Sequence, residues 1–280
     1  MNAPAEVRVI KTAAETALAT AYTEARTRLP GGDAIAAQRA AAFDIFAKEG
    51  LPHRRVEEWK YTDLRALMRE AKPLASPPDA AAKARAKTAG QMLGDVETRR
   101  IVFVDGAFVQ ELTDTAALER GLTVGSFAAA LAAGDPALTE KLGTLAPGSD
   151  VAVALNTALM GDGAVIRIGA GSTIERPLHL IFVASEKPAA SFVRSLVVVE
   201  PGARVIILAS VCCAPGLTMM RPWNTPWASS SSTDLNTSRL WQLRALWLTT
   251  SVVSACWRPL ISVVPRMPAT VSSPLKLRNS

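Results

Sequence analysis

The chain has 280 residues, 31 Lys and Arg, 25 Asp and Glu, and a formal net charge of +6. The charge is uneven, because residues 1–208 carry 24 basic and 24 acidic side chains, whereas residues 209–280 carry seven basic side chains and one acid, Asp234. A neutral front region without a basic stripe does not favour nucleic-acid binding, although a pI near 9.5 would suggest it.

Targeting and membrane segments are not evident from the sequence. The N-terminus has no basic segment followed by an apolar run, and three cysteines are an odd number for a disulfide framework. The apolar stretch Leu240–Trp257 is interrupted by Gln242 and Arg244, so its apolar part is too short to span a bilayer. We therefore expect a cytoplasmic protein without a membrane span.

Helical periodicity dominates the first 70 residues. Apolar side chains recur at helical spacing over Glu6–Leu29, and Pro30-Gly31-Gly32 ends this first predicted helix. Asp33 is expected to cap a second helix that ends at Gly50. A third begins after Thr62, which is the expected N-cap. The sequence thus predicts a small N-terminal helical domain.

The segment Arg54–Arg65, called the joint below, connects the second and third predicted helices. It contains seven charged side chains around Trp59 and Tyr61. Each of these aromatic side chains combines a large apolar body with a polar tip, so they can hold a connection on a neighbouring surface while the charges stay solvated. We expect an ordered joint, and its simplest role is to dock one domain on another.

The next part of the chain is predicted to begin with a linker and to continue with mixed structure. Pro73, Pro77 and Pro78 interrupt any helix after the third one, which favours a surface connection. Asp105-Gly106 lies between two apolar runs and predicts a β-hairpin. Three further helices are predicted at Ser126–Ala133, Pro136–Leu142 and Asp150–Gly161.

Short apolar runs rich in Val and Ile follow Gly163 and predict β-strands. The runs are Ala164–Ile168, Leu178–Val183, Phe192–Val199 and Val205–Leu208. The pattern Ile168-x-x-Gly171-x-x-Ile174 recurs 31 residues later as Val199-x-x-Gly202-x-x-Val205. Stacked coils of a parallel β-helix would produce this recurrence, because each coil buries its apolar face only against the next.

Twelve residues in two patches carry a family resemblance. They are Arg55, Glu57, Glu58, Trp59, Lys60, Tyr61, Thr62, Leu155, Asn156, Asp162, Gly163 and Pro177. In this order they resemble the SufB/SufD family, whose members are scaffolds of the SUF system for iron–sulfur cluster assembly. The joint favours the SufD branch of that family.

The resemblance implies a fold, a function and partners. The implied fold is an N-terminal helical domain followed by a right-handed parallel β-helix. The implied function is a non-catalytic scaffold without an intrinsic cofactor, because the parent complex handles the cluster. SufB-like and SufC-like subunits are the implied partners, and SufC would supply the ATPase activity. No catalytic, cofactor-binding or metal-ligating residue can be carried over to this chain.

Other chemistries have weaker signals. Gly161-x-Gly163 and Gly169-x-Gly171 lack the residues that complete a phosphate-binding loop, so both are interpreted as turns. His179 is a lone histidine on a predicted strand, and the adjacent pair Cys212-Cys213 lacks metal-ligand spacing. A β-helical acyltransferase with hexapeptide repeats, suggested by Ile168–Gly171, and a helical adaptor module stay open as alternatives.

Residues 209–280 depart from the preceding pattern. They hold all three Cys, five of six Trp and seven of 18 Pro, but one Gly of 17. This composition is typical of a GC-rich coding sequence read out of frame, so we predict a frameshift near residues 208–212 that impairs function. The predicted class is α+β, divided into a helical domain (1–70), a linker (71–99), an α/β connecting region (100–162), the first coils of a β-helix (163–208) and an anomalous tail (209–280).

Overall fold

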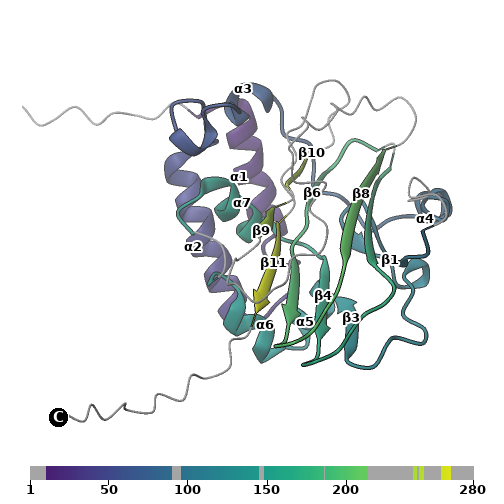
Figure 1. The fold of residues 1–280 in the computed structure, drawn as a ribbon. Helices are drawn as coiled ribbons and strands as arrows, with labels where there is room; N and C mark the ends of the chain where they lie inside the picture. The colour runs from purple at the N-terminus through teal and green to yellow at the C-terminus, as the bar shows by residue number, and fades with distance from the viewer. Residues whose placement is uncertain are drawn as a thin grey trace, which may run out of the picture.

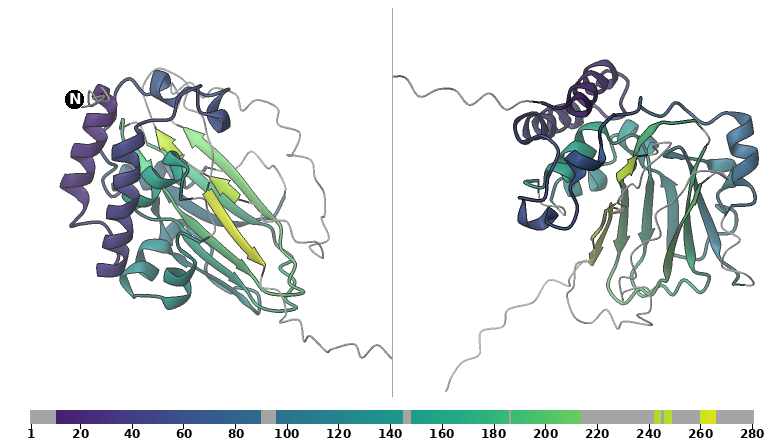
Figure 2. Two further views of the ribbon diagram at one scale, coloured as in Figure 1. Left: turned by 90° about the vertical axis from the view of Figure 1, so that its left-hand side faces the viewer. Right: turned by 90° about the horizontal axis from the view of Figure 1, so that it is seen from above.

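The computed structural model describes residues 11–89, 96–144, 148–185 and 187–213, and the backbone of three strands between residues 242 and 265. Helices α1, α2 and α7 lie together on one side of two β-sheets, and α4 lies on the opposite side (Figures 1 and 2). The predicted mixed α+β class is therefore confirmed.

The helical side of the molecule consists mainly of α1 (Ala13–Ala25), α2 (Asp33–Glu49) and α7 (Val151–Leu159). The first of these ends at Ala25, before the predicted end at Leu29, and the predicted start at Glu6 lies outside the described residues. These helices bury a shared apolar cluster that includes Leu18, Phe46 and Leu155. The predicted helical character of this part is confirmed over the described residues.

Two of the predicted helix caps were wrong by one residue. The N-cap of α2 is Gly32, which makes no side-chain cap bond, and Asp33 occupies the first turn, where its charge favours the helix dipole. The N-cap of α3 (Leu64–Leu67) is Asp63 rather than Thr62, because the Asp63 side chain accepts from the backbone N–H of Ala66 at 2.9 Å.

The predicted linker contains ordered structure. Helix α4 (Ala80–Ala86) begins at its N-cap Asp79 and buries Ala82 and Ala86 against the outer face of one sheet. Before it, Leu74 forms a parallel bridge with Ala190. Much of the segment 71–89 thus lies against the strands.

The first sheet has the strand order β2-β1-β5-β8, and the second has the order β3-β4-β7-β11-β9. The first sheet contains β1 (Arg99–Val104), β2 (Ala107–Phe108), β5 (Leu178–Ala184) and β8 (Ile207–Cys213). The second contains β3 (Leu122–Ser126), β4 (Ala164–Ile168), β7 (Ser195–Val199), β9 (Gln242–Arg244) and β11 (Leu260–Pro265). A separate pair joins β6 (Ala190–Phe192) to β10 (Leu246–Leu248).

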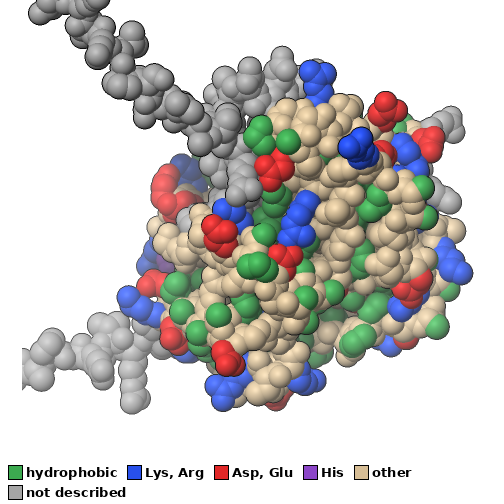
Figure 3. All heavy atoms as spheres, turned by 90° about the horizontal axis from the view of Figure 1, so that it is seen from below, with side chains coloured by type: hydrophobic (Ala, Val, Ile, Leu, Met, Phe, Trp, Pro, Cys, Tyr) green, Lys and Arg blue, Asp and Glu red, His purple; other side chains and the backbone are tan. Residues whose placement is uncertain are grey.

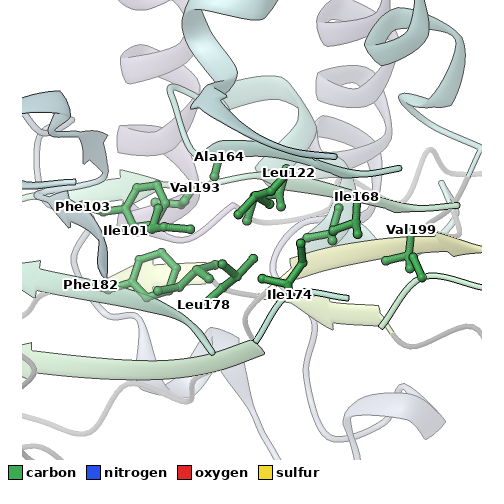
Figure 4. Packing of buried hydrophobic residues seen from close by; sticks show 14 of the residues in the cluster. Ile101, Phe103, Leu122, Ala164, Ile168, Ile174, Leu178, Phe182, Val193 and Val199 are labelled. Carbon is green, nitrogen blue, oxygen red and sulfur yellow. The ribbon is translucent and has the colours of Figure 1, made fainter. Parts of the chain in front are cut away.

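The main core lies between the two sheets. Ile101, Phe103 and Phe182 of the first sheet lie toward Ile168 and Val199 of the second (Figure 4). The rings of Phe103 and Phe182 stack with centroids 4.6 Å apart. This apolar layer fixes the distance between the sheets.

Two strand–corner–strand units stack on each other in parallel. Strand β4 pairs with β7 so that Ile168 lies opposite Val199, and β5 pairs with β8 so that Leu178 lies opposite Ile207. The predicted offset of 31 residues therefore corresponds to real strand neighbours. The corners meet at Gly171, whose φ is +66°, and an added Cβ on Gly202 would contact it. The extension of these two units to a right-handed parallel β-helix stays a prediction.

Two predicted strand boundaries need correction. The predicted strand Phe192–Val199 is divided, because β6 ends at Phe192 and β7 begins at Ser195. The intervening Arg194 turns its buried guanidinium toward α7, which a continuous strand would not permit. At the other end, β8 continues to Cys213 rather than stopping at Leu208.

The hairpin and the three helices before the stacked strands agree with the sequence. Asp105 and Gly106 both have positive φ, of 49° and 86°, and β1 pairs with β2 on either side of them. The helices are α5 (Phe127–Ala132), α6 (Pro136–Lys141) and α7, with N-caps Ser126, Asp135 and Asp150. Their predicted positions are confirmed to within about two residues.

Candidate functional site

The joint forms a closed loop on the helical side of the molecule. Its base is fixed because the N–H of Arg65 donates to the carbonyl of Pro52 at 3.1 Å, and both Leu51 and Pro52 are buried. Within the loop, the short 3₁₀ helix η1 (Glu57–Trp59) gives the chain a local hydrogen-bonded turn. The predicted order of the joint is therefore confirmed.

A buried carboxylate attaches the joint to α1. Glu15 is 4% exposed, and it accepts hydrogen bonds from the N–H groups of Leu51 and Thr12, each at 2.7 Å. Burial alone would raise the pKa of Glu15, but these backbone bonds and the nearby Arg65 outweigh it and lower the pKa. An ionised side chain thus holds the start of the joint against the first helix.

The joint has an inward and an outward face. Trp59 is half-buried and packs against the apolar cluster of α1, α2 and α7. Tyr61 is 91% exposed, and the Lys60 ammonium lies 5.3 Å from its ring centroid. Lys60 also pairs with Glu57, and Arg55 is exposed. Trp59 therefore contributes to packing, whereas Tyr61 does not.

The remaining signature residues of the joint lie at its surface or near it. Glu58 is exposed, and Thr62 is partly buried and donates its backbone N–H to the carbonyl of Trp59 at 2.8 Å. The N–H of Arg55 donates to Nδ1 of His53 at 3.2 Å. These contacts maintain the turn and leave most of the charged groups in solvent.

The second patch of signature residues meets at a junction between α7 and the strands. Arg194, which is 8% exposed, donates through Nε and Nη2 to Oδ1 of Asn156 at 3.0 and 2.9 Å. Its Nη2 also donates to Oγ1 of Thr157 at 2.9 Å. Asn156 in turn donates to the carbonyl of Val193 at 3.2 Å. The corner between β6 and β7 is thereby tied to α7.

Asp162 joins three further elements at this junction. Its Oδ1 accepts from Oγ of Ser126 at 2.8 Å, from the N–H of Ala128 at 2.9 Å and from the N–H of Gly163 at 2.8 Å. Its Oδ2 accepts from the N–H of Phe108 at 2.8 Å. One carboxylate therefore fixes β2, the first turn of α5 and the start of β4.

Gly163 is required by a close approach of two backbones. A Cβ placed on it would overlap the carbonyl oxygen of Arg194. Leu155, one turn before, is 1% exposed within the cluster against which Trp59 also packs. Pro177 lies elsewhere, at the start of β5, where its carbonyl accepts from the N–H of Arg99 at 2.8 Å. The twelve residues thus form two groups and one separate contact.

Sequence reasoning missed the buried partners of these residues. Neither Glu15 nor Arg194 was identified, although both are nearly buried and hold the two groups in place. The available signal at Arg194 is a single charged residue inside the apolar run Phe192–Val199, because a buried charge needs a partner.

A second buried arginine links α2 to the end of α7. Arg39 is 2% exposed and donates to the carbonyls of Met160 and Pro30, both at 2.8 Å, and of Ala158 at 3.3 Å. Burial lowers the pKa of Arg39 to about 10, while the nearby Tyr22 opposes the shift. Its positive charge satisfies carbonyl groups at the C-terminal end of a helix.

No reactive cluster is found in the described part of the chain. In residues 11–89, 96–144, 148–185 and 187–213, no three His, Cys, Asp or Glu side chains could hold one metal ion. His179 is 1% exposed and hydrogen-bonds Oγ of Ser210 at 2.8 Å, and Cys212 has a free thiol. Burial, followed by the charge of Arg100, lowers the pKa of His179. The Cys256 side chain lies outside the described residues.

Surface charge and helix length give two further observations. On the face that Figure 3 shows, basic and acidic side chains are interspersed rather than gathered by sign. Among the helices that the structure describes, none is long and apolar enough to cross a membrane.

Comparison with known proteins identifies the family. A family model described as the SufBD protein N-terminal region matches residues 12–180, from the N-cap of α1 into β5. The chain belongs to the SufBD family. All twelve signature residues of this SufBD chain lie inside the matched region, including the joint and Asp162.

A curated relative adds a second comparison for the SufBD chain. It is similar to the "Iron-sulfur cluster assembly SufBD family protein" of Synechocystis sp., with 32% identity over 203 residues. The aligned part covers 71% of this chain and 44% of that protein, so the chain spans less than half the length of the relative.

Proposed function

We propose that this chain is a SufD-like, non-catalytic scaffold component of iron–sulfur cluster assembly. The observation that carries the proposal is the family match over residues 12–180, which includes both the joint and the junction. The name of the Synechocystis relative supports the same process. Family membership does not favour the alternatives of a hexapeptide acyltransferase or a helical adaptor.

The proposal includes partners and a division of labour. SufB-like and SufC-like subunits would assemble with this chain in the cytoplasm, and ATP hydrolysis would belong to the SufC-like subunit. The cluster would be handled by the complex, and no cofactor would reside in this chain. The two stacked units would be the first coils of a right-handed parallel β-helix.

The proposal also assigns most of the last segment to another reading frame. Strand β8 stays in register with β5 as far as Ala184 opposite Cys213, and Val211 packs against the main core. This continuity favours a frame change after Cys213, slightly later than the predicted 208–212. A scaffold whose remaining coils are replaced in this way would be impaired in assembly.

Resequencing the gene tests the reading frame. Translation of all three frames downstream of residue 213 should restore strands with glycine corners in a frame other than the present one. A verified gene whose alternative frames contain no such pattern would contradict the frameshift.

Co-purification tests the assembly function. The SufB and SufC homologues from the same genome should be recovered with a frame-corrected chain, and in smaller amount with the 280-residue chain. Failure of both chains to recover either subunit would contradict the scaffold role. Equal recovery would show that the frame change does not impair assembly.

A further inference from the structure

The outward face of the joint exposes an aromatic side chain that the fold does not use. Tyr61 is 91% exposed and Val56 is 37% exposed, and the described large apolar side chains include few others with comparable exposure. The ring of Tyr61 is approached by the Lys60 ammonium at 5.3 Å. Packing within the described residues therefore gives no reason for an aromatic residue at this position.

The same face carries arginine charge that is not neutralised locally. Glu57 pairs with Lys60, whereas Arg54 and Arg55 are exposed and have no ion pair among the described residues. Glu58 is the remaining exposed acid of the loop. The outward face thus combines one aromatic ring with two available guanidinium groups, and its acids disfavour a phosphate backbone as the ligand.

This face is held in a fixed conformation before any partner binds. The hydrogen bond from Arg65 to Pro52 closes the loop, and the buried Glu15 holds Leu51. Asp63 caps the helix that follows. A loop that is already ordered loses little backbone entropy on binding, so its exposed side chains can contribute to affinity.

We propose that the outward face of the joint (Arg54, Arg55, Val56, Lys60 and Tyr61) binds another protein subunit. The subunit presents an apolar pocket that receives Tyr61 and an acidic rim that pairs with the two arginines. Tyr and Arg are the residue types that most often dominate protein–protein binding, and complementary charge sets the orientation. The inference rests on the proposed function, which identifies the subunit as part of the SufB–SufC assembly.

Binding measurements with two joint variants test this surface. Tyr61→Ala and Arg55→Glu would each be compared with the unaltered 280-residue chain and with its frame-corrected form, using the purified SufB–SufC complex as the probe. Each variant should weaken binding by about tenfold or more, and the loss for Arg55→Glu should decrease at high salt. Arg120→Glu reverses an exposed charge outside the joint and should leave binding unchanged.

The outcomes separate this inference from the proposed function. If the unaltered chains bind and both joint variants bind equally well, the surface assignment is wrong and the scaffold function stands. If neither unaltered chain binds, the partner and the scaffold function are both overturned. Equal urea midpoints for the variants and the unaltered chain would establish that weaker binding does not come from unfolding.

Discussion

The joint and the junction contain the same classes of side chain but use them in opposite ways. At the junction, Arg194, Asn156 and Asp162 direct their polar groups inward and bond to one another or to backbone. In the joint, Arg55 and Tyr61 direct theirs into solvent. Internal contacts therefore explain the residue types at the junction, whereas those on the outward face of the joint require a partner to explain them.

The largest effect is expected at the centre of the junction. Arg194→Met removes a buried guanidinium and leaves the acceptors of Asn156 and Thr157 without their donor. The free energy of unfolding in urea should fall by about 4 kcal/mol. The matched change Arg204→Met, at an exposed arginine, should cost less than about 0.5 kcal/mol. Similar losses for the two variants would contradict a structural role for Arg194.

A smaller effect is expected from Gly163→Ala. The added methyl group would overlap the carbonyl of Arg194, so the two backbones would have to separate at a cost of about 3 kcal/mol. Gly161→Ala is the control, because the nearest atom to its Cβ would be 3.9 Å away. Urea denaturation of the two variants measures the difference, and an unchanged midpoint for Gly163→Ala would refute the close approach.

The attachment of the joint can be tested by pH. Glu15→Gln should destabilise the chain by about 2 kcal/mol near pH 7, because charged hydrogen bonds to Leu51 and Thr12 are weakened. Since folding lowers the pKa of Glu15, its stabilisation is present above the usual value near 4.5 and is lost as pH falls through the lowered pKa. The difference between the two proteins should therefore shrink in acid. A constant difference in urea midpoint would argue against an ionised Glu15.

Local sequence rules predicted a large part of the fold. The Asp105-Gly106 hairpin, the caps of α5 to α7 and the 31-residue offset all follow from short-range patterns that the structure retains. The caps of α2 and α3 were misplaced because Gly32-Asp33 and Thr62-Asp63 each offer adjacent candidates. Only the path of the chain in space distinguishes the two.

The candidate site was less predictable than the fold. The resemblance located the joint, but no periodic pattern separates the half-buried Trp59 from the exposed Tyr61 two residues later. The contacts of Glu15 and Arg194 join positions 36 and 38 residues apart, to Leu51 and to Asn156. Such pairs depend on tertiary packing and leave no spacing rule in the sequence.

The account is tested most directly by urea denaturation of Trp59→Ala and Tyr61→Ala side by side. The inward Trp59 should cost about 2 kcal/mol of unfolding free energy when truncated, because it packs against the helical cluster while half-exposed. The outward Tyr61 should cost less than about 0.5 kcal/mol. An equal loss from both variants would contradict the division of the joint into a packing face and a binding face.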